Sequence, residues 1–204
     1  MTEYHLTTPI SEKVARELKI GDIIYISGQD VYTARDMAHQ RALIMHNQGK
    51  KLPITLEGGV IYHSGPLVRE REGRWEMISA GPTTSFRMEP YEDQFLRNFK
   101  VRILIGKGGM GSRTLAALKE VGAVYCSYIG GCGALAAQSL KEVRGYEWND
   151  LGMPEALWFI TADNFGPLIV TMDSYGNSLY SKVEEEVRKN KSKLYTKLGI
   201  LEDS

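Results

Sequence analysis

Two short segments of the chain carry side chains suited to binding a small anion. The segment Gly81–Met88, with the sequence GPTTSFRM, places several hydroxyls and an arginine close together. The segment Gly106–Gly111, with the sequence GKGGMG, combines a lysine with glycines that let a ligand approach the backbone N–H groups. Hydroxyls, cations and backbone N–H donors are the groups that bind carboxylates and phosphates. We therefore interpret the two segments as one half of an active site for a small dianionic substrate.

Each segment also has a plain structural explanation. The hydroxyls of Thr83, Thr84 and Ser85 could cap a helix over Glu89–Arg97. The Gly106–Gly111 loop could be a tight turn, although it lies between a predicted strand and a predicted helix, where backbone N–H groups can hold an anion. The loop is not a Walker P-loop, because its lysine precedes the glycines. It also lacks the Gly-x-Gly-x-x-Gly spacing of dinucleotide-binding sites.

A third candidate, Arg35, lies near the predicted start of a helix. Thr33 and Asp36 have the spacing of a capping box, and apolar residues recur at helical intervals after them. This pattern predicts a helix from about Thr33 with Arg35 in its first turn, where the helix dipole and the guanidinium would both attract a carboxylate. Asp36 and His39 could orient the guanidinium, or they could be a helix cap and a surface imidazole.

Composition narrows the class of protein. With 204 residues, and 43% of them hydrophobic, the chain can bury a full core, and we predict a single domain over 1–204. The 25 basic residues balance the 25 acidic ones, which argues against nucleic acid as a partner. The first residues lack the pattern of a signal peptide, and no apolar run approaches the roughly 20 residues of a membrane span. These features predict a soluble, cytoplasmic protein without a membrane partner.

The cysteines and histidines predict no metal site in this chain. Cys126 and Cys132 cannot build a disulfide framework or a four-ligand metal site, and we expect both to be buried apolar side chains. The histidines lack the spacing of metal ligands, such as a His-x-x-x-His pair. These histidines are His5, His39, His46 and His63.

The elements that would position the candidate residues alternate between strands and helices. Strands are predicted over 22–28, 59–63, 75–80, 101–105, 123–128, 157–161 and 168–172. Further helices are predicted over 112–121, from about 134, and over 178–198. This order favours an α/β fold with a largely parallel or mixed sheet. The last helix is amphipathic, and we expect its apolar stripe to pack on the body. The stripe consists of Leu179, Val183, Val187 and Leu194.

Together, the segments Thr33–His39, Gly81–Met88 and Gly106–Gly111 resemble a known family. They look like the β subunit, or C-terminal domain, of the iron–sulfur hydro-lyases that comprise class I fumarase and L-tartrate dehydratase. The similarity runs from about Leu6 to Leu194, which is nearly the whole chain. Two further segments match recurrent parts of this family, Gly65–Pro66 and Met153–Trp158.

This resemblance implies a swivelling β/β/α domain, with a mixed sheet and flanking helices, that closes over a partner α subunit in a hetero-oligomer. In that family the α subunit carries a 4Fe-4S cluster, so this chain would hold no cofactor itself. By residue match, Thr83 falls where the family places the base that removes a proton next to a carboxylate. The positions where the family holds the substrate carboxylates fall on Arg35, Thr84, Arg87 and Lys107.

The chemistry of these residue types agrees with the resemblance. Two or three cations around a C4 dicarboxylate would stabilise the aci-carboxylate that develops when the α-proton leaves. A threonine hydroxyl has a pKa far above neutral, so Thr83 could act as the base only if cations stabilise its alkoxide or a neighbour relays the proton. We therefore predict the β subunit of a fumarate hydratase, active with its α subunit. L-tartrate dehydration is the close alternative, and a stand-alone anion- or nucleotide-binding module is a second one.

Overall fold

The computed structural model describes residues 1–199, apart from the side chain of Ser192. Its main feature is a seven-stranded mixed sheet. The strands of this sheet are β1 (Glu3–Thr7), β2 (Ile23–Thr33), β3 (Val60–Tyr62), β6 (Ile103–Gly106), β7 (Val124–Ser127), β8 (Leu140–Glu147) and β9 (Leu157–Met172). Their order in the sheet is β1-β2-β3-β6-β7-β9-β8. The first five run parallel to one another, whereas β9 runs antiparallel to β2, β7 and β8.

The sheet closes on itself through β9. This strand pairs with β7 at its end and with β2 over most of its length, so β2, β3, β6, β7 and β9 form a ring. Side chains along the strands alternate between two apolar cores, as the pleat requires. In β6, for example, Ile103 and Ile105 face the core on the inner side of the ring, and Leu104 faces the core under the helices.

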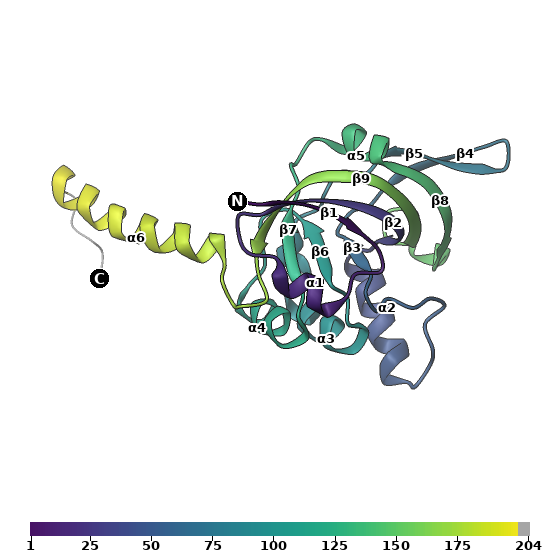
Figure 1. The fold of residues 1–204 in the computed structure, drawn as a ribbon, viewed down its shortest axis with the longest axis horizontal. Coiled ribbons are helices and arrows are strands. Elements are labelled where there is room, and N and C mark those ends of the chain that lie inside the picture. Colours follow the sequence, from purple (N-terminus) through teal and green to yellow (C-terminus); the bar gives the residue numbers. More distant parts are fainter. Residues whose placement is uncertain (200–204) are drawn as a thin grey trace.

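Three helices cover the outer face of the ring. They are α2 (Asp36–Asn47), α3 (Glu89–Phe99) and α4 (Ser112–Val121). Figure 1 shows them together beneath the sheet. The remaining elements are α1 (Glu12–Glu17), β4 (Leu67–Arg71), β5 (Arg74–Ser79), α5 (Gly133–Ser139), α6 (Leu179–Leu198) and the short 3-10 helices η1 (Ser85–Met88) and η2 (Asn149–Leu151). The prediction of a mixed α/β fold with flanking helices is therefore confirmed.

One long strand replaces two predicted ones. The strands predicted over 157–161 and 168–172 are the two ends of β9, which continues through Asp163, Asn164 and the Gly166–Pro167 pair. These polar and turn-forming residues interrupt the apolar pattern. The structure accommodates them through register shifts where β9 crosses β2. The prediction also missed α1 and the strands β1, β4 and β8. Buried and exposed residues do not alternate regularly in these strands.

The second helix begins later than predicted. α2 starts at Asp36, with Arg35 as its N-cap residue rather than in its first turn. Thr33 is the last residue of β2, and its buried hydroxyl makes no hydrogen bond within the described part of the chain, so the predicted capping box is wrong. A residue distant in sequence takes over this function, since the backbone N–H of Met37 donates to Glu155 Oε2 (3.1 Å).

The helix predicted over 178–198 is confirmed, but its packing is not. Ser178 caps α6, and after the first turn the helix extends away from the body (Figure 1). Val183, Val187 and Leu194 are 58%, 58% and 54% exposed, so the apolar stripe does not pack on the body. The helix is amphipathic, as predicted. The periodicity of its apolar residues does not show whether another element covers the apolar face.

Two further predictions concern the whole chain. None of the helices within residues 1–199 is both long and apolar enough to cross a membrane. The predicted single domain over 1–204 stays a prediction, and its residues 200–204 lie outside the described residues.

Candidate active site

The two motifs predicted to form a site lie side by side. The backbone N–H of Thr83 donates to the carbonyl of His63, at the end of β3 (2.7 Å). The N–H of Lys107 donates to the Thr83 carbonyl (3.3 Å), and the N–H of Ser85 donates to the Lys107 carbonyl (3.0 Å). Segment 83–85 therefore lies between the ends of β3 and β6 like a short extra strand. This arrangement sets Thr84 beside Lys107 in a parallel bridge.

The polar side chains of these motifs are available to a ligand. The hydroxyls of Thr83 and Thr84 make no hydrogen bond to any residue of 1–199, and neither caps a helix. The explanation of these two hydroxyls as helix caps is therefore wrong. Arg87 and Lys107 are exposed, and within the same residues neither forms an ion pair. Arg87 lies one turn beyond Thr84 in η1, and in the described chain its side chain makes no hydrogen bond or ion pair with the other candidates.

Arg35 reaches the same region from α2. Gly65 packs against its guanidinium, because a Cβ on that glycine would lie 2.9 Å from Arg35 Nη1. The preceding residue, Ser64, bridges to Pro82, next to Thr83. Arg35 therefore lies near the turn that carries the predicted base. Its Nε pairs with Glu155 Oε1 at 3.3 Å.

Glu155, rather than Asp36 or His39, contacts the Arg35 guanidinium and can orient it. Asp36 accepts a hydrogen bond from the Tyr91 hydroxyl (2.7 Å), and His39 is fully buried with Nδ1 2.8 Å from the Arg35 carbonyl. Neither side chain contacts the guanidinium, and His39 is not a surface imidazole. Sequence reasoning missed Glu155 because it lies far along the chain. The segment Met153–Trp158, noted for its resemblance, was the available signal.

Beneath the site, three ionisable side chains form what we call the His–Glu–His cluster, consisting of His39, His63 and Glu92. All three are fully buried. Glu92 Oε2 lies 3.5 Å from His39 Nε2 and 3.2 Å from His63 Nε2. On its other side, His63 Nδ1 lies 2.9 Å from Ser85 Oγ. The cluster thus connects α2, α3 and the end of β3, although the spacing of the histidines along the chain gave no sign of it.

The pKa values of the cluster differ because its charges are buried together. Burial alone would raise the pKa of Glu92, but attraction to His39 and then His63 outweighs burial and lowers the pKa to about 2. Burial acts to lower the pKa of His39 too, yet Glu92 outweighs it and raises the pKa of this imidazole. For His63, burial prevails and lowers the pKa. The cluster therefore favours a carboxylate, one imidazolium and one neutral imidazole.

The close packing around Gly106 explains why the second motif, Gly106–Gly111, begins with a glycine. A Cβ at this position would overlap Ser85 Oγ and would lie 3.2 Å from both His63 Nδ1 and the Tyr125 hydroxyl. The Tyr125 hydroxyl also donates to Ser85 Oγ (2.9 Å). The glycine is therefore required by the close approach of a buried polar group, beyond any contact with a ligand.

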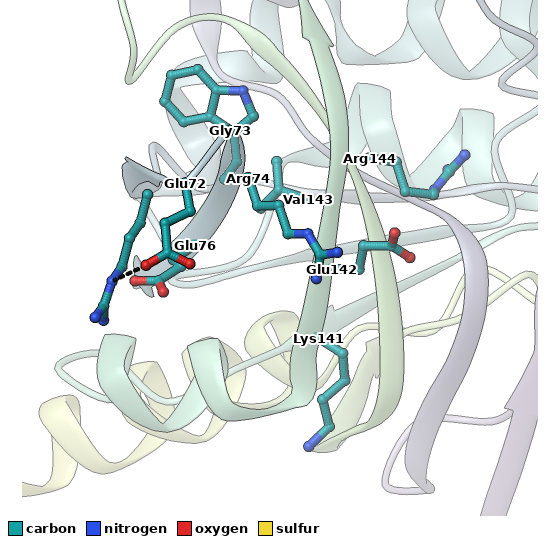
Figure 2. Close-up of a pocket in the computed structure, with 10 residues that line it drawn as sticks. Glu72, Gly73, Arg74, Glu76, Lys141, Glu142, Val143 and Arg144 are labelled. Atoms are coloured by element: carbon teal, nitrogen blue, oxygen red, sulfur yellow. Dashed lines mark ion pairs between the residues drawn. The ribbon is translucent and has the colours of Figure 1, made fainter.

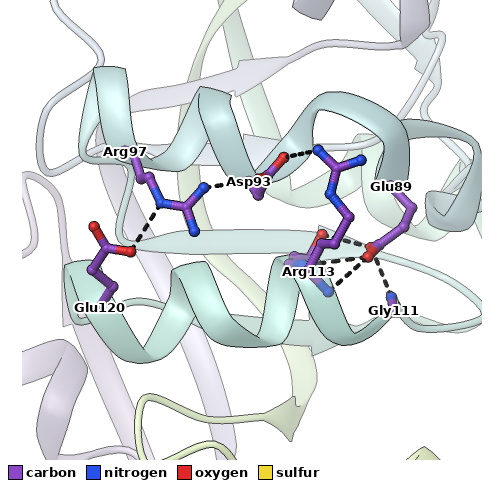
Figure 3. Close-up of polar contacts among 7 residues, drawn as sticks. Glu89, Asp93, Arg97, Gly111, Arg113 and Glu120 are labelled. Carbon is purple, nitrogen blue, oxygen red and sulfur yellow. Dashed lines mark hydrogen bonds and ion pairs between the residues drawn. The ribbon is translucent and has the colours of Figure 1, made fainter.

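The helix that follows this loop already holds an anion. Figure 3 shows the Glu89 carboxylate at the N-terminus of α4, facing the first turn of the helix. It accepts from the backbone N–H groups of Gly111 (2.7 Å), Arg113 (3.1 Å) and Thr114 (3.3 Å), and from the Thr114 hydroxyl (2.6 Å). These are the N–H groups that would otherwise bind a phosphate. This carboxylate fills the anion position that the sequence suggested for a ligand.

A separate hollow of about 1110 Å³ lies between the β4–β5 hairpin and β8. Side chains of both charges line it, as Figure 2 shows. The labelled charged ones are Glu72, Arg74, Glu76, Lys141, Glu142 and Arg144. None of the predicted site residues lines this hollow, so we do not assign the site to it.

The cysteines do not fit an iron–sulfur cluster held by this chain. Cys126 is buried in the inner core, where burial raises the pKa of its thiol, and Cys132 is half-buried. A 4Fe-4S cluster needs at least three thiolate ligands, and the sequence contains only these two cysteines. Any such cluster would have to be bound by another chain.

The two segments bring hydroxyls and cations together, a combination suited to a small anion, and comparison with known proteins identifies the family of the chain. The model of the family described as the fumarase C-terminus matches residues 1–183. The chain therefore belongs to this family of class I fumarate hydratase and L-tartrate dehydratase β subunits, whose members are hydro-lyases.

The names of similar proteins agree with this assignment to the family. The L(+)-tartrate dehydratase subunit β of Escherichia coli K12 is 41% identical over 177 residues, covering 87% of this chain and 86% of that protein. A protein of Methanocaldococcus jannaschii, provisionally named as the same subunit, is 44% identical over 179 residues, covering 87% and 91%. A protein of Geobacillus stearothermophilus, provisionally named class I fumarate hydratase, is 44% identical over 181 residues. This match covers 88% of the present chain but 34% of that protein.

Proposed function

We propose that this chain is the β subunit of an iron–sulfur fumarate hydratase, which interconverts fumarate and malate by adding or removing water. The observation that carries the proposal is that two hydroxyls without hydrogen bonds to residues 1–199 lie beside the exposed Lys107 where the ends of β3 and β6 meet, close to the Glu155-paired Arg35. Thr83, Thr84 and Lys107 are held there by backbone hydrogen bonds, and Arg35 reaches the same turn. A substrate with two carboxylates needs this combination of donors.

In this proposal each side chain has a separate task. Arg35, Arg87, Lys107 and the Thr84 hydroxyl bind the two carboxylates of the substrate. Thr83 removes the proton from the carbon next to one carboxylate, and the negative charge that develops is stabilised by the cations. The same cations make the Thr83 hydroxyl more acidic, which a threonine base requires.

The proposal includes an α subunit that carries the 4Fe-4S cluster. The cluster would act as a Lewis acid that binds the substrate hydroxyl. The two cysteines of this chain are too few to hold such a cluster.

Large apolar side chains around the site agree with a partner that covers it. Phe86, Ile129 and Leu135 are 60%, 63% and 52% exposed. Phe86 belongs to the Gly81–Met88 segment, and Ile129 and Leu135 are near in sequence to Gly130 and Gly133, which pack on Lys107 and Gly81. We infer that the domain swivels to close the site over this partner. We also infer a cytoplasmic location, because free cysteines are typical of a reducing environment.

L-tartrate dehydration is the second candidate. The relatives named as tartrate dehydratase subunits favour it, since they are 41–44% identical over most of this chain. Malate and L-tartrate each carry two carboxylates and at least one hydroxyl, so the same residues would bind either one. A stand-alone phosphate-binding module is less well supported, because Glu89 already occupies the N-terminus of α4.

The test is an activity assay of this chain mixed anaerobically with its candidate α subunit, using fumarate and L-tartrate in parallel. We expect activity only in the mixture. We expect Lys107→Ala and Arg87→Ala each to lower kcat/KM roughly 100-fold or more, as the loss of a charge-assisted contact would. Lys13→Ala and Arg74→Ala are matched controls, because both side chains are exposed and, within residues 1–199, form no ion pair.

The comparison of substrates decides the reaction. Faster turnover of fumarate supports a fumarate hydratase, and faster turnover of L-tartrate names the second candidate. Ordinary activity in Lys107→Ala or Arg87→Ala would overturn the site assignment, whichever substrate reacts.

A further inference from the structure

We propose that Glu92 is a positioning residue for the candidate active site. Its carboxylate lies between the imidazoles of His39 and His63, and these imidazoles contact the Arg35 carbonyl and the Ser85 hydroxyl, in the two segments that carry the predicted cation and base. The proposal rests on the proposed function, because the positions of Arg35 and Thr83 matter for catalysis only if these residues bind and deprotonate a dicarboxylate.

The first arm runs through His39 to Arg35. His39 Nδ1 lies 2.8 Å from the Arg35 carbonyl, which also accepts the backbone N–H of His39 (3.1 Å). Arg35 is the N-cap residue of α2, where the chain turns from an extended into a helical conformation. Its side chain is held separately by Glu155. A buried imidazole on its carbonyl therefore fixes the point from which the guanidinium extends.

The second arm runs through His63 to the Thr83–Ser85 segment. The His63 carbonyl accepts the Thr83 N–H, and its Nδ1 lies 2.9 Å from Ser85 Oγ. His63 thus holds this segment at two points, on either side of Thr84. The Tyr125 hydroxyl donates to the same Ser85 oxygen, and Gly106 leaves room for this contact. Movement of the His63 ring would therefore be passed to Ser85, two residues from the predicted base.

The groups that face the imidazole nitrogens determine where the protons lie. His39 Nδ1 faces a carbonyl and Nε2 faces a carboxylate; both are acceptors, so this imidazole carries two protons and a positive charge. Since Ser85 Oγ receives a hydrogen from Tyr125, its own hydrogen is free to go to His63 Nδ1. His63 is then neutral with its proton on Nε2, toward Glu92. The cluster carries one positive and one negative charge, which is what a fully buried site tolerates.

A metal ion explains the cluster less well. The two histidines and Glu92 could act as ligands, and their ligand atoms lie within 4.8 Å of one another. Two ligands bound to zinc at about 2.1 Å can be at most about 4.2 Å apart, so the cluster is wide for a metal. No fourth residue joins them among the described residues. The positioning role needs no ion.

Kinetics of the assembled enzyme test the proposal. Glu92→Gln keeps the shape of the side chain but removes the charge that holds both imidazoles. We expect kcat to fall roughly 10- to 100-fold and KM for the dicarboxylate to rise, because both the base and Arg35 shift. Ser85→Ala removes the contact to His63 and the acceptor of the Tyr125 hydroxyl but leaves the His39 arm intact, so kcat per folded enzyme, with the folded fraction measured by circular dichroism, should fall while KM stays near the wild-type value. Asp93→Asn is the control, because Asp93 lies on the same helix and pairs with Arg97 and Arg113 outside the cluster.

Loss of folded protein would be a different result. It lowers the apparent kcat without changing KM, so a Glu92→Gln enzyme with unchanged KM would overturn the positioning role. A Glu92→Gln enzyme with the same kcat and KM as the Asp93→Asn enzyme would also overturn the positioning role.

Nitrogen-15 NMR of histidine in the full chain tests the same arrangement without any activity. We expect one buried imidazole with two protons and one neutral imidazole with its proton on Nε2, and we expect Glu92→Gln to lose the first pattern. Two neutral imidazoles, or one bound metal ion per chain in metal analysis, would overturn the proposal. An inactive wild-type complex with the expected NMR pattern would overturn the proposed function while the proton arrangement stands.

Discussion

At the scale of single residues, the candidate site depends on the carboxylates of Glu92 and Glu155, which no sequence motif indicated. Arg35, Thr83 and Lys107 could be predicted from the sequence because their residue types and neighbours indicate anion chemistry. Glu92 and Glu155 could not, since each acts only through residues that the fold brings to it. A glutamate in a helix or a loop reads as a solvated side chain until its tertiary neighbours are known.

We expect the attraction of Glu92 to His39 and His63 to make stability depend on pH. Its pKa is about 2 in the folded chain, against a usual value of 4.5. The unfolded chain therefore takes up a proton first, and the free energy of unfolding falls as the pH drops from about 4.5 toward 2. The full shift corresponds to roughly 3 kcal/mol. Urea unfolding at several pH values between about 3 and 7 measures it.

Glu92→Gln is the control for this acid effect, because glutamine does not titrate. Its free energy of unfolding should change less steeply over the same pH range. A variant that loses stability as steeply as the wild-type chain would show that other groups cause the acid sensitivity.

At the scale of elements, helix starts show where sequence rules succeed and where they fail. The helix predicted over 112–121 coincides with α4, and the glycine before it is its N-cap residue. No side chain at the start of α2 or α4 caps its own helix. Glu155 and Glu89 from other segments do so instead, which is why the capping box at Thr33 misled the prediction. Capping rules read only nearby residues, whereas these caps are tertiary contacts.

We predict that Glu89→Gln lowers the free energy of unfolding by about 1–2 kcal/mol. The carboxylate satisfies N–H groups at the α4 N-terminus and opposes the positive end of the helix dipole, and a neutral amide does so less well. Chemical denaturation measures the loss. Glu120→Gln is the comparison, since Glu120 is 60% exposed and pairs with Arg97 at the surface. Equal losses in the two variants would contradict the capping role.

At the scale of the whole molecule, the class of fold followed from the alternation of strands and helices, but its closure did not. Gly166 and Pro167 read as a break between two strands, and only the pairing with β2 shows that β9 passes through them. The position of α6 was also beyond the sequence. An apolar stripe predicts burial, but α6 extends away from the body (Figure 1), and Val183, Val187 and Leu194 of its stripe are exposed.

We expect the outer part of α6 to add little to stability. Replacing Val183, Val187 and Leu194 together by serine should change the melting temperature by less than about 2 °C, because these side chains are more than half exposed. Tyr180→Ala should lower it by several degrees, since Tyr180 packs on Gly109 and its hydroxyl lies 2.5 Å from Ser127 Oγ. Differential scanning calorimetry compares the two. A large loss in the triple serine variant would mean that the stripe is covered in solution.

Synthesis of the chain on the ribosome leaves the ring of strands open until late. β2 emerges early, but β9, the strand that pairs with its second edge, comes only with residues 157–172. Until then one edge of β2 keeps its N–H and C=O groups unpaired and can recruit another nascent chain. Folding of this protein is therefore coupled to completion of nearly all of its described residues, and chaperones that shield strand edges should improve its yield.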